Sequence, residues 1–290
     1  PAQRLELETL KTQLADPTRI AQTKREAALL LLTRPYPQAI ALARDFLNDQ
    51  ANRPAQIAIA EAIVQSGKTD PEFVKPLLAM VKGEESSVRG PAAYALVGYK
   101  DDAVLEEFIR VAAERKFSLA VRTTVIEALG RSLEKKVINA LVVLLDEPDE
   151  TITTAACDAL ERLTSIRAFK RDAGQWKSWW AENKHKPQSD WLADLAENLA
   201  RNSQALEKEN AAIRRRLAAV MTSLYAATPP AGRDPLLEEM LRDPVGEVRL
   251  AGVQLVQQRL AAGQTLPEPL RAQVRARLAD SEPAVRQATA

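Results

Sequence analysis

A short motif recurs along the chain, in which a valine–arginine step opens an alanine-rich apolar run. Copies begin at Val88, Val121, Val248 and Val285, and a degenerate copy at Ile152 lacks the arginine. The interval is 33 residues from Val88 to Val121, 31 to Ile152, and 37 from Val248 to Val285. Such a period holds two helices of about a dozen residues and two turns. It predicts a stack of about seven helical hairpins.

The segment before each motif copy marks where the second helix of a hairpin begins. An apolar amphipathic stretch leads into a turn of carboxylates or proline, as at 83–85, 146–149 and 243–244. Carboxylates and proline are favoured at helix starts, where backbone N–H groups lack partners. The last hairpin breaks off at Ala290, and the chain begins at Pro1 without methionine. We therefore expect a fragment of a longer protein.

The composition agrees with helices and narrows the possible chemistry. Apolar residues make up 46% of the chain, yet aromatic residues only 4%, and only ten residues are glycine. Such a core is built from Ala, Leu, Ile and Val, as in helical proteins. A single cysteine, Cys157, and a single histidine, His185, cannot form a Cys/His zinc site or a disulfide within one chain. We expect no metal and no cofactor.

The valine–arginine step after an acidic or Asp-Pro turn resembles the HEAT repeat over most of the chain outside residues 165–232. The resemblance implies a right-handed α-α superhelix of antiparallel helix pairs that serves as a protein-binding scaffold. In such a stack the repeat arginines are expected to be structural and to bond the turn of their own or the next repeat. They are Arg89, Arg122, Arg249 and Arg286.

A tryptophan-rich stretch interrupts the repeats. Trp176, Trp179 and Trp180 fall at i, i+3 and i+4, so they share one face of a short helix, and Trp191 follows closely. We expect these rings to fill a gap where regular stacking lapses. The stretch is also similar to an insertion in bacterial HEAT-repeat proteins, although Lys170 stands where a glycine is expected.

A long helix is predicted from Asp190 to about Ala227, a segment without glycine or proline. Apolar residues recur along it at seven-residue spacing: Leu192, Leu199, Leu206, Ile213 and Val220. Because this stripe drifts towards Leu217 and Leu224, we expect it to pack against the solenoid, with Ile213 and Leu217 buried. Arg214, Arg215 and Arg216 would then be a solvated face, and self-association through the helix is the alternative.

Net charge argues against a dedicated nucleic-acid binder. The chain carries 40 basic and 39 acidic side chains; residues 1–165 sum to −3 and residues 166–290 to +4. Only the second part is mildly basic, which is little for phosphate neutralisation. One enzymatic alternative stays open, because some HEAT-like solenoids excise damaged DNA bases with tryptophans and an aspartate. Here Asp172 and the four tryptophans would take those roles.

The sequence thus predicts an all-α HEAT-like solenoid in three parts: repeats over 1–165, the Trp-rich insertion and long helix over 166–232, and further repeats over 233–290. We expect a non-catalytic scaffold, monomeric, whose partner is another protein or another segment of the same full-length chain. Nucleic acid and a membrane span are not expected, and the compartment is left open. Candidate binding residues are Trp176, Trp179, Trp180, Trp191, Arg214 and Arg215.

Overall fold

The computed structural model describes residues 2–99 and 101–290. Helix accounts for 78% of the chain, and the described residues contain no strand. The described part therefore confirms the all-α prediction. The chain divides into two compact units, Pro1–Leu199 and Ala200–Ala290. The predicted middle segment, 166–232, falls partly in each unit. None of the described helices is long and apolar enough to cross a membrane.

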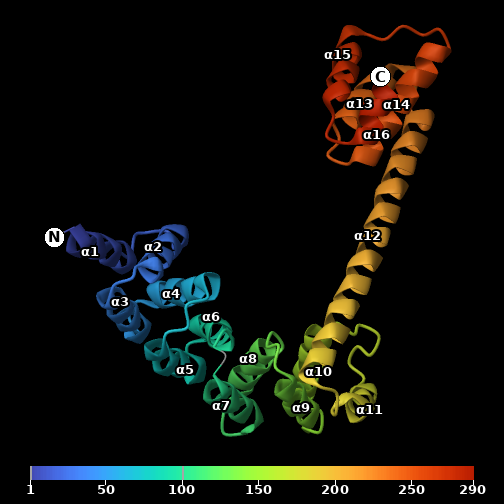
Figure 1. The fold of residues 1–290 in the computed structure, drawn as a ribbon. Coiled ribbons are helices and arrows are strands. Elements are labelled where there is room, and N and C mark those ends of the chain that lie inside the picture. Colours follow the sequence, from blue (N-terminus) through green and yellow to red (C-terminus); the bar gives the residue numbers. More distant parts are fainter. Residues whose placement is uncertain (1, 100) are drawn as a thin grey trace. The chain divides into compact units, whose positions relative to one another are not determined.

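The first unit contains five antiparallel helix pairs and one further helix. The pairs are α1 (Ala2–Ala15) with α2 (Ala21–Thr33), α3 (Pro37–Asn48) with α4 (Arg53–Ser66), α5 (Val74–Lys82) with α6 (Ser86–Val97), α7 (Asp102–Ala113) with α8 (Leu119–Leu129), and α9 (Lys135–Leu144) with α10 (Glu150–Thr164). A single 3-10 turn, η1 (Pro71–Phe73), precedes α5, and α11 (Ala173–Asn183) follows α10. Within this unit the second helices α2, α4, α6, α8 and α10 contact one another in sequence order. They line the inner side of the arc that the pairs describe (Figure 1).

The second unit contains two more pairs. These are α13 (Pro230–Arg242) with α14 (Gly246–Ala261), and α15 (Glu268–Ala276) with α16 (Pro283–Thr289), the latter two joined through the 3-10 turn η2 (Arg277–Ala279). Seven helix pairs are thus present in the described residues, as the period predicts. The 40-residue helix α12 (Gln188–Ala227) begins in the first unit and ends in the second. The predicted long helix is confirmed.

Small side chains allow adjacent second helices to approach closely. A Cβ at Gly130 would lie 2.9 Å from the Cα of Ala159 on α10, so no larger residue fits there without a shift. Ala92, Ala93 and Ala128 are all buried in the same continuous core. Because each pair is apolar on two faces, stacking on both neighbours buries surface that one pair alone would expose. The second unit has its own cluster, which includes Leu237, Met240 and Val248.

The apolar stripe of α12 does not pack as expected. Ile213 and Leu217, predicted to be buried, are 59% and 39% exposed. The prediction that the stripe packs against the solenoid is therefore wrong for this structure. Other sides of the helix make the contacts: Trp191 and Leu195 are buried in the core of the first unit, and Tyr225 in that of the second.

A buried ion pair joins the two repeats of the second unit. Arg249 at the start of α14 donates two hydrogen bonds to the Asp280 carboxylate, Nε to Oδ2 at 2.8 Å and Nη2 to Oδ1 at 2.7 Å. Both side chains are almost fully buried, and Arg277 approaches the same carboxylate at 3.0 Å. These hydrogen bonds from Arg249 lower the pKa of Asp280 from 3.8 to about 2.

Because the pKa of Asp280 is lower in the folded chain than in the unfolded chain, its charge stabilises the fold above about pH 4, and this stabilisation is lost as pH falls towards 2. We expect the loss to be about 2 kcal/mol in the free energy of unfolding. Urea unfolding between pH 5 and pH 2 measures it. The Asp280→Asn variant should be destabilised at pH 5 and show a flatter pH dependence. Glu239→Gln, which alters an exposed carboxylate of α13, should follow the unmodified chain; identical pH profiles for all three proteins would contradict the prediction.

Candidate functional site

All repeats but the degenerate one at Ile152 hold a side chain near the start of the second helix that donates a hydrogen bond to the end of the first helix or to the turn after it. In the first unit the donors are Lys24, Gln56, Arg89 and Arg122, and all four are buried. Each donates to a backbone carbonyl at or just after the end of the first helix of its own repeat. The pairs are Lys24 Nζ with Leu14 O, Gln56 Nε2 with Leu47 O at 2.8 Å, Arg89 Nη2 with Gly83 O at 2.9 Å, and Arg122 Nε with Ala112 O at 2.8 Å. We call these residues the donor row.

The second unit continues the donor row with the other two repeat arginines. Arg249 Nη1 donates to Asp243 O at 2.8 Å, and Arg286 Nη1 donates to Ser281 O at 3.0 Å. Arg122 and Arg249 also reach the next repeat, Arg122 through an ion pair with Glu147 at 3.3 Å and Arg249 through Asp280. The four arginines thus bond turns of their own or the next repeat.

The donor row has a simple physical cause. The last carbonyls of a helix lack partners within it, and a buried carbonyl without one costs free energy. A long polar side chain from the neighbouring helix supplies the missing donor and ties the pair together. The chemistry of the donor varies: burial lowers the pKa of Lys24, but the side chain still reaches Leu14. In the degenerate repeat Thr153 stands in the arginine position and donates within its own helix, to Asp149 O at 2.9 Å.

The sequence analysis missed Lys24 and Gln56, because it searched for arginine. Counting back from Arg89 by 33 residues gives Gln56, and by a further 32 gives Lys24. The period was therefore a sufficient signal, whereas the residue type was not.

Replacing Gln56 by leucine should destabilise the first unit. The substitution keeps the volume but leaves Leu47 O without a donor in a buried place, which costs about 1–3 kcal/mol in the free energy of unfolding. The matched control is Gln65→Leu, an exposed position on the same helix. Chemical denaturation compares the two variants. Equal stability of both would show that the buried amide bond contributes nothing.

The second helices of the first unit turn one side away from the repeat core, along the inner side of the arc (Figure 1). One row of positions, five residues after Gln56, Arg89, Arg122 and Thr153, contains Glu61, Tyr94, Glu127 and Asp158. We call this surface the second-helix face. Contacts across the repeats hold it in place: Arg25 pairs with Glu61 at 3.2 Å, the Arg131 guanidinium lies 4.0 Å from the Tyr94 ring centroid, and Arg162 Nη1 donates to Glu127 O at 3.1 Å. The face therefore presents fixed charges of both signs with an aromatic ring between them.

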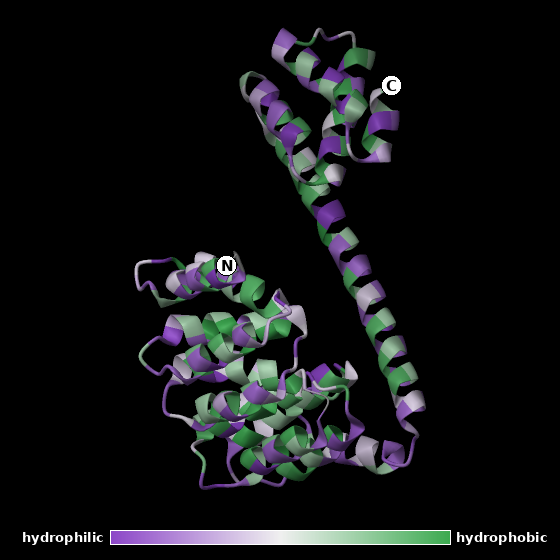
Figure 2. Cartoon of the chain, turned by 60° about the vertical axis from the view of Figure 1, so that its left-hand side comes forward, coloured by the Kyte–Doolittle hydropathy of each residue, from purple (hydrophilic) through white to green (hydrophobic). Residues whose placement is uncertain are grey.

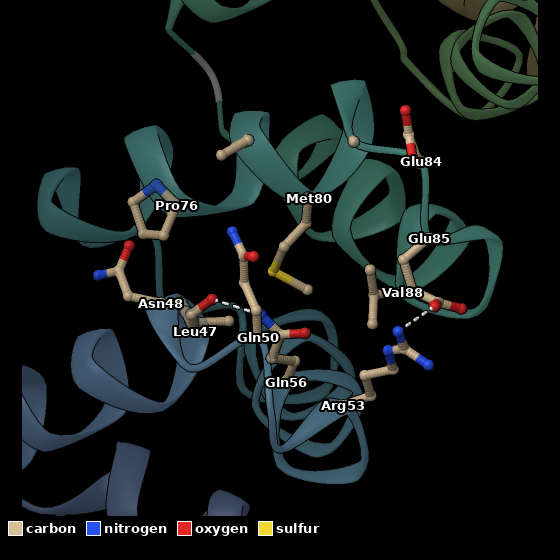
Figure 3. A pocket seen from close by; sticks show the side chains of 12 residues that line it. Leu47, Asn48, Gln50, Arg53, Gln56, Pro76, Met80, Glu84, Glu85 and Val88 are labelled. Atoms are coloured by element: carbon tan, nitrogen blue, oxygen red, sulfur yellow. Dashed lines mark hydrogen bonds and ion pairs between the residues drawn. The ribbon is translucent and has the colours of Figure 1, made fainter.

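A cavity of about 460 Å³ lies beside the turns of the second and third pairs. Met80 and Val88 supply apolar lining, while Gln56 and Asn48 supply amides (Figure 3). Arg53 closes one side through an ion pair with Glu85 at 2.8 Å. The Gln56 amide in this wall already donates to Leu47 O, so part of the lining is committed to the fold.

The tryptophan cluster covers the end of the repeat stack in the first unit. Trp176 and Trp180 lie buried on α11, which packs against α9 and α10, and Trp191 is buried at the start of α12. Their polar atoms are satisfied within the fold: Trp176 Nε1 donates to Lys170 O at 2.9 Å, and Trp180 Nε1 to Asn139 Oδ1 at 3.1 Å. Trp179 is half-buried and meets Trp176 edge to face at 5.9 Å between ring centroids.

The loop before α11 explains two residues that the sequence analysis singled out. Lys170 has φ 48°, in the left-handed region, which accounts for the glycine expected at this place. Asp172 caps α11, accepting from Gln175 N at 3.0 Å and from Gln175 Nε2 at 2.9 Å. These hydrogen bonds lower the pKa of Asp172, which makes its carboxylate a weaker base. An open depression of about 500 Å³ borders Asp172 and Trp179.

Comparison with known proteins agrees with this geometry. A family model described as HEAT repeats matches residues 74–161, the span from the start of α5 into α10. Residues 74–161 thus form HEAT repeats. No curated protein matches the chain in sequence. A HEAT-repeat fold is consistent with a protein-interaction scaffold, because stacked helix pairs present an extended surface.

Among solved structures the likeness is distant. Human deoxyhypusine hydroxylase shares 17% identity over 99% of this chain and 94% of its own, with a TM-score of 0.36. Importin β shares 14% identity over 98% of this chain, again with a TM-score of 0.36; the match spans 45% of the importin chain. Scores this low transfer no activity to this chain.

The remaining candidate residues lie apart from one another. Arg214 pairs with Glu247 at 3.3 Å, and exposed Arg215 donates to Ala211 O at 3.2 Å. Cys157 is buried in α10, and burial raises the pKa of its thiol. His185 is exposed after α11. Across residues 2–99 and 101–290, no three His, Cys, Asp or Glu side chains gather in a way that could hold a metal ion.

The burial of the tryptophans generates a test that separates packing from base recognition. Trp176→Ala should cost about 3–5 kcal/mol in the free energy of unfolding, and Trp179→Ala clearly less, because only Trp176 is fully buried. Thermal unfolding measures both, and fluorescence anisotropy with a duplex that carries an abasic site measures DNA binding. A Trp179→Ala variant that stays fully stable and abolishes a measurable affinity for damaged DNA would contradict the packing role.

Proposed function

We propose that this protein is a non-catalytic scaffold that binds another protein, or another segment of its own full-length chain, through the second-helix face. The observation that carries the proposal is the continuity of that face over consecutive repeats, with Arg25, Arg131 and Arg162 each reaching across to the next or the preceding helix. A surface fixed in this way is pre-organised, so less side-chain entropy is lost when a partner binds.

The chemistry of the face favours an extended polypeptide of mixed charge. Glu61 and Glu127 would meet basic side chains of the partner, and Arg131 with Tyr94 would meet acidic and aromatic ones. Aromatic and arginine side chains are enriched at the centres of protein interfaces. Tyr94 is therefore the residue whose loss should weaken binding most.

The proposal that the chain has no catalytic activity is supported by the structural roles and the burial of its titratable groups. Asp172 caps a helix, Asp280 holds Arg249, and the Cys157 thiol is buried with a raised pKa, so none of the three is poised as a base or nucleophile.

Site-specific photo-crosslinking in the native host tests the scaffold proposal. A benzophenone amino acid replaces Tyr94 on the second-helix face or, as the matched control, Val143, which is 62% exposed on the first helix α9. We expect one discrete protein adduct from position 94 and none from position 143, and the adduct should diminish when Glu61 and Glu127 are both changed to Lys. Adducts that form equally at both positions, or at neither, would overturn the assignment of this face.

A further inference from the structure

The helix α12 carries an exposed apolar stripe. It consists of Leu199, Leu206, Ile213, Leu217, Val220 and Leu224, whose exposed fractions run from 39% to 59%. We call these residues the α12 stripe. Hydrophobic positions recur along the length of the helix in Figure 2. A row of large apolar side chains at this exposure is typical of a surface that binds a partner.

The spacing of the α12 stripe is that of a coiled-coil seam. If Leu199, Leu206, Ile213 and Val220 are the d positions of successive heptads, Leu217 and Leu224 fall at a positions. Earlier a positions hold the smaller Ala196 and Ser203 and the polar Asn210. A single polar residue at an a position sets the register of a coiled coil at some cost in stability. Large apolar residues thus occupy both the a and the d positions over the final third of the stripe, and only the d positions before that.

The charged residues beside the seam divide into two halves. Glu207 and Glu209 flank it before the middle of the helix, and Arg214 and Arg216 flank it after the middle. Arg214 already pairs with Glu247, whereas Glu209 and Arg216 have no ion pair with any residue that the structure describes. Glu209 and Arg216 both occupy g positions.

We propose that the α12 stripe binds a second copy of this chain in an antiparallel coiled coil. The g positions of two helices face each other only in the antiparallel arrangement, which brings Glu209 of each copy to Arg216 of the other. In the register that allows this ion pair, the twofold axis of the two helices passes between residues 211 and 212. Leu217 then packs beside Leu206 of the second copy, and Leu224 beside Leu199. A parallel pair would instead offer Glu209 only Arg214, which Glu247 already occupies. This inference does not depend on the second-helix face.

The contacts that α12 makes within its own chain also leave the stripe open to a second copy. The apolar contacts of α12 within the two units use Trp191, Leu195, Ala218, Met221 and Tyr225, none of which is part of the α12 stripe. A second helix can therefore reach the stripe without displacing them. The expectation of a monomer rested on burial of Ile213 and Leu217, and both are exposed. With the stripe open, the reason for expecting a monomer no longer holds.

Light scattering during gel filtration, over a concentration series, measures the assembly directly. We expect about twice the monomer mass of 31.9 kDa for the unmodified chain. The variant Leu206→Gln with Ile213→Gln should be monomeric and remain folded, because both side chains are exposed in the single chain. The matched control Ala205→Gln with Ala212→Gln changes two exposed positions on another side of the helix and should remain dimeric. A monomeric unmodified chain, or a dimer that survives the first variant, would overturn the proposal.

Charge reversal tests the pairing of Glu209 with Arg216. Either Glu209→Arg or Arg216→Glu alone should raise the dissociation constant about tenfold, since two exposed pairs turn from attraction to repulsion. The double variant should restore the original value. In a parallel dimer the double variant would not recover, because Arg at 209 would then face Arg214.

Disulfide crosslinking fixes the orientation of the helices. A mixture of Leu206→Cys chains with Leu217→Cys chains should crosslink on mild oxidation, whereas Leu206→Cys chains alone should not. The native Cys157 is buried and should not interfere. Efficient crosslinking of Leu206→Cys chains with one another would show a parallel pair and refute the antiparallel arrangement.

Discussion

The structure depends on how each helix pair satisfies the free carbonyls where its first helix ends. A side chain near the start of the second helix donates to them. Lys24, Gln56, Arg89, Arg122 and Arg249 do so from buried positions, and Arg286 from an exposed one. Because unpaired buried carbonyls are costly, this hydrogen bond helps to hold the two helices of a pair together. The pair α9–α10 departs from this pattern, because Thr153 donates within its own helix, yet α10 still contacts α8 as the other second helices of the first unit contact their neighbours.

This regular stacking separates the roles of the two sides of each second helix. The inward side carries the donors and the alanines that allow close approach, so it tolerates little change. The side that faces away from the core carries Glu61, Tyr94, Glu127 and Asp158. The first three contact residues of adjacent repeats, and Asp158 contacts Arg171 in the loop before α11. Substitutions on the side that faces away from the core can therefore change which partner binds without changing the fold. Repeat architectures generally divide stability and recognition in this manner.

The sequence predicted the features that depend on the repeat period. It did not predict burial where burial depends on which other element packs against a residue. The repeats, α11 and α12 follow from spacing alone. Lys24 and Gln56 also lie at the period, but a search for arginine missed them, because lysine, glutamine and arginine can all donate to the equivalent carbonyl although they share no motif. The heptads of α12 show which residues share a side of the helix, but not whether another element covers that side. Ile213 was therefore predicted buried and is exposed.

The thiol of Cys157, the single cysteine of the chain, can be used to detect local unfolding. Cys157 is buried in α10, between the preceding repeat and the tryptophan cluster, and burial raises the pKa of its thiol. A reagent can modify it only while α10 has moved away from its neighbours, so the rate of labelling measures how often that end of the stack opens. The chain thus contains a native probe of local unfolding at the junction of its regular and irregular parts, without any engineered label.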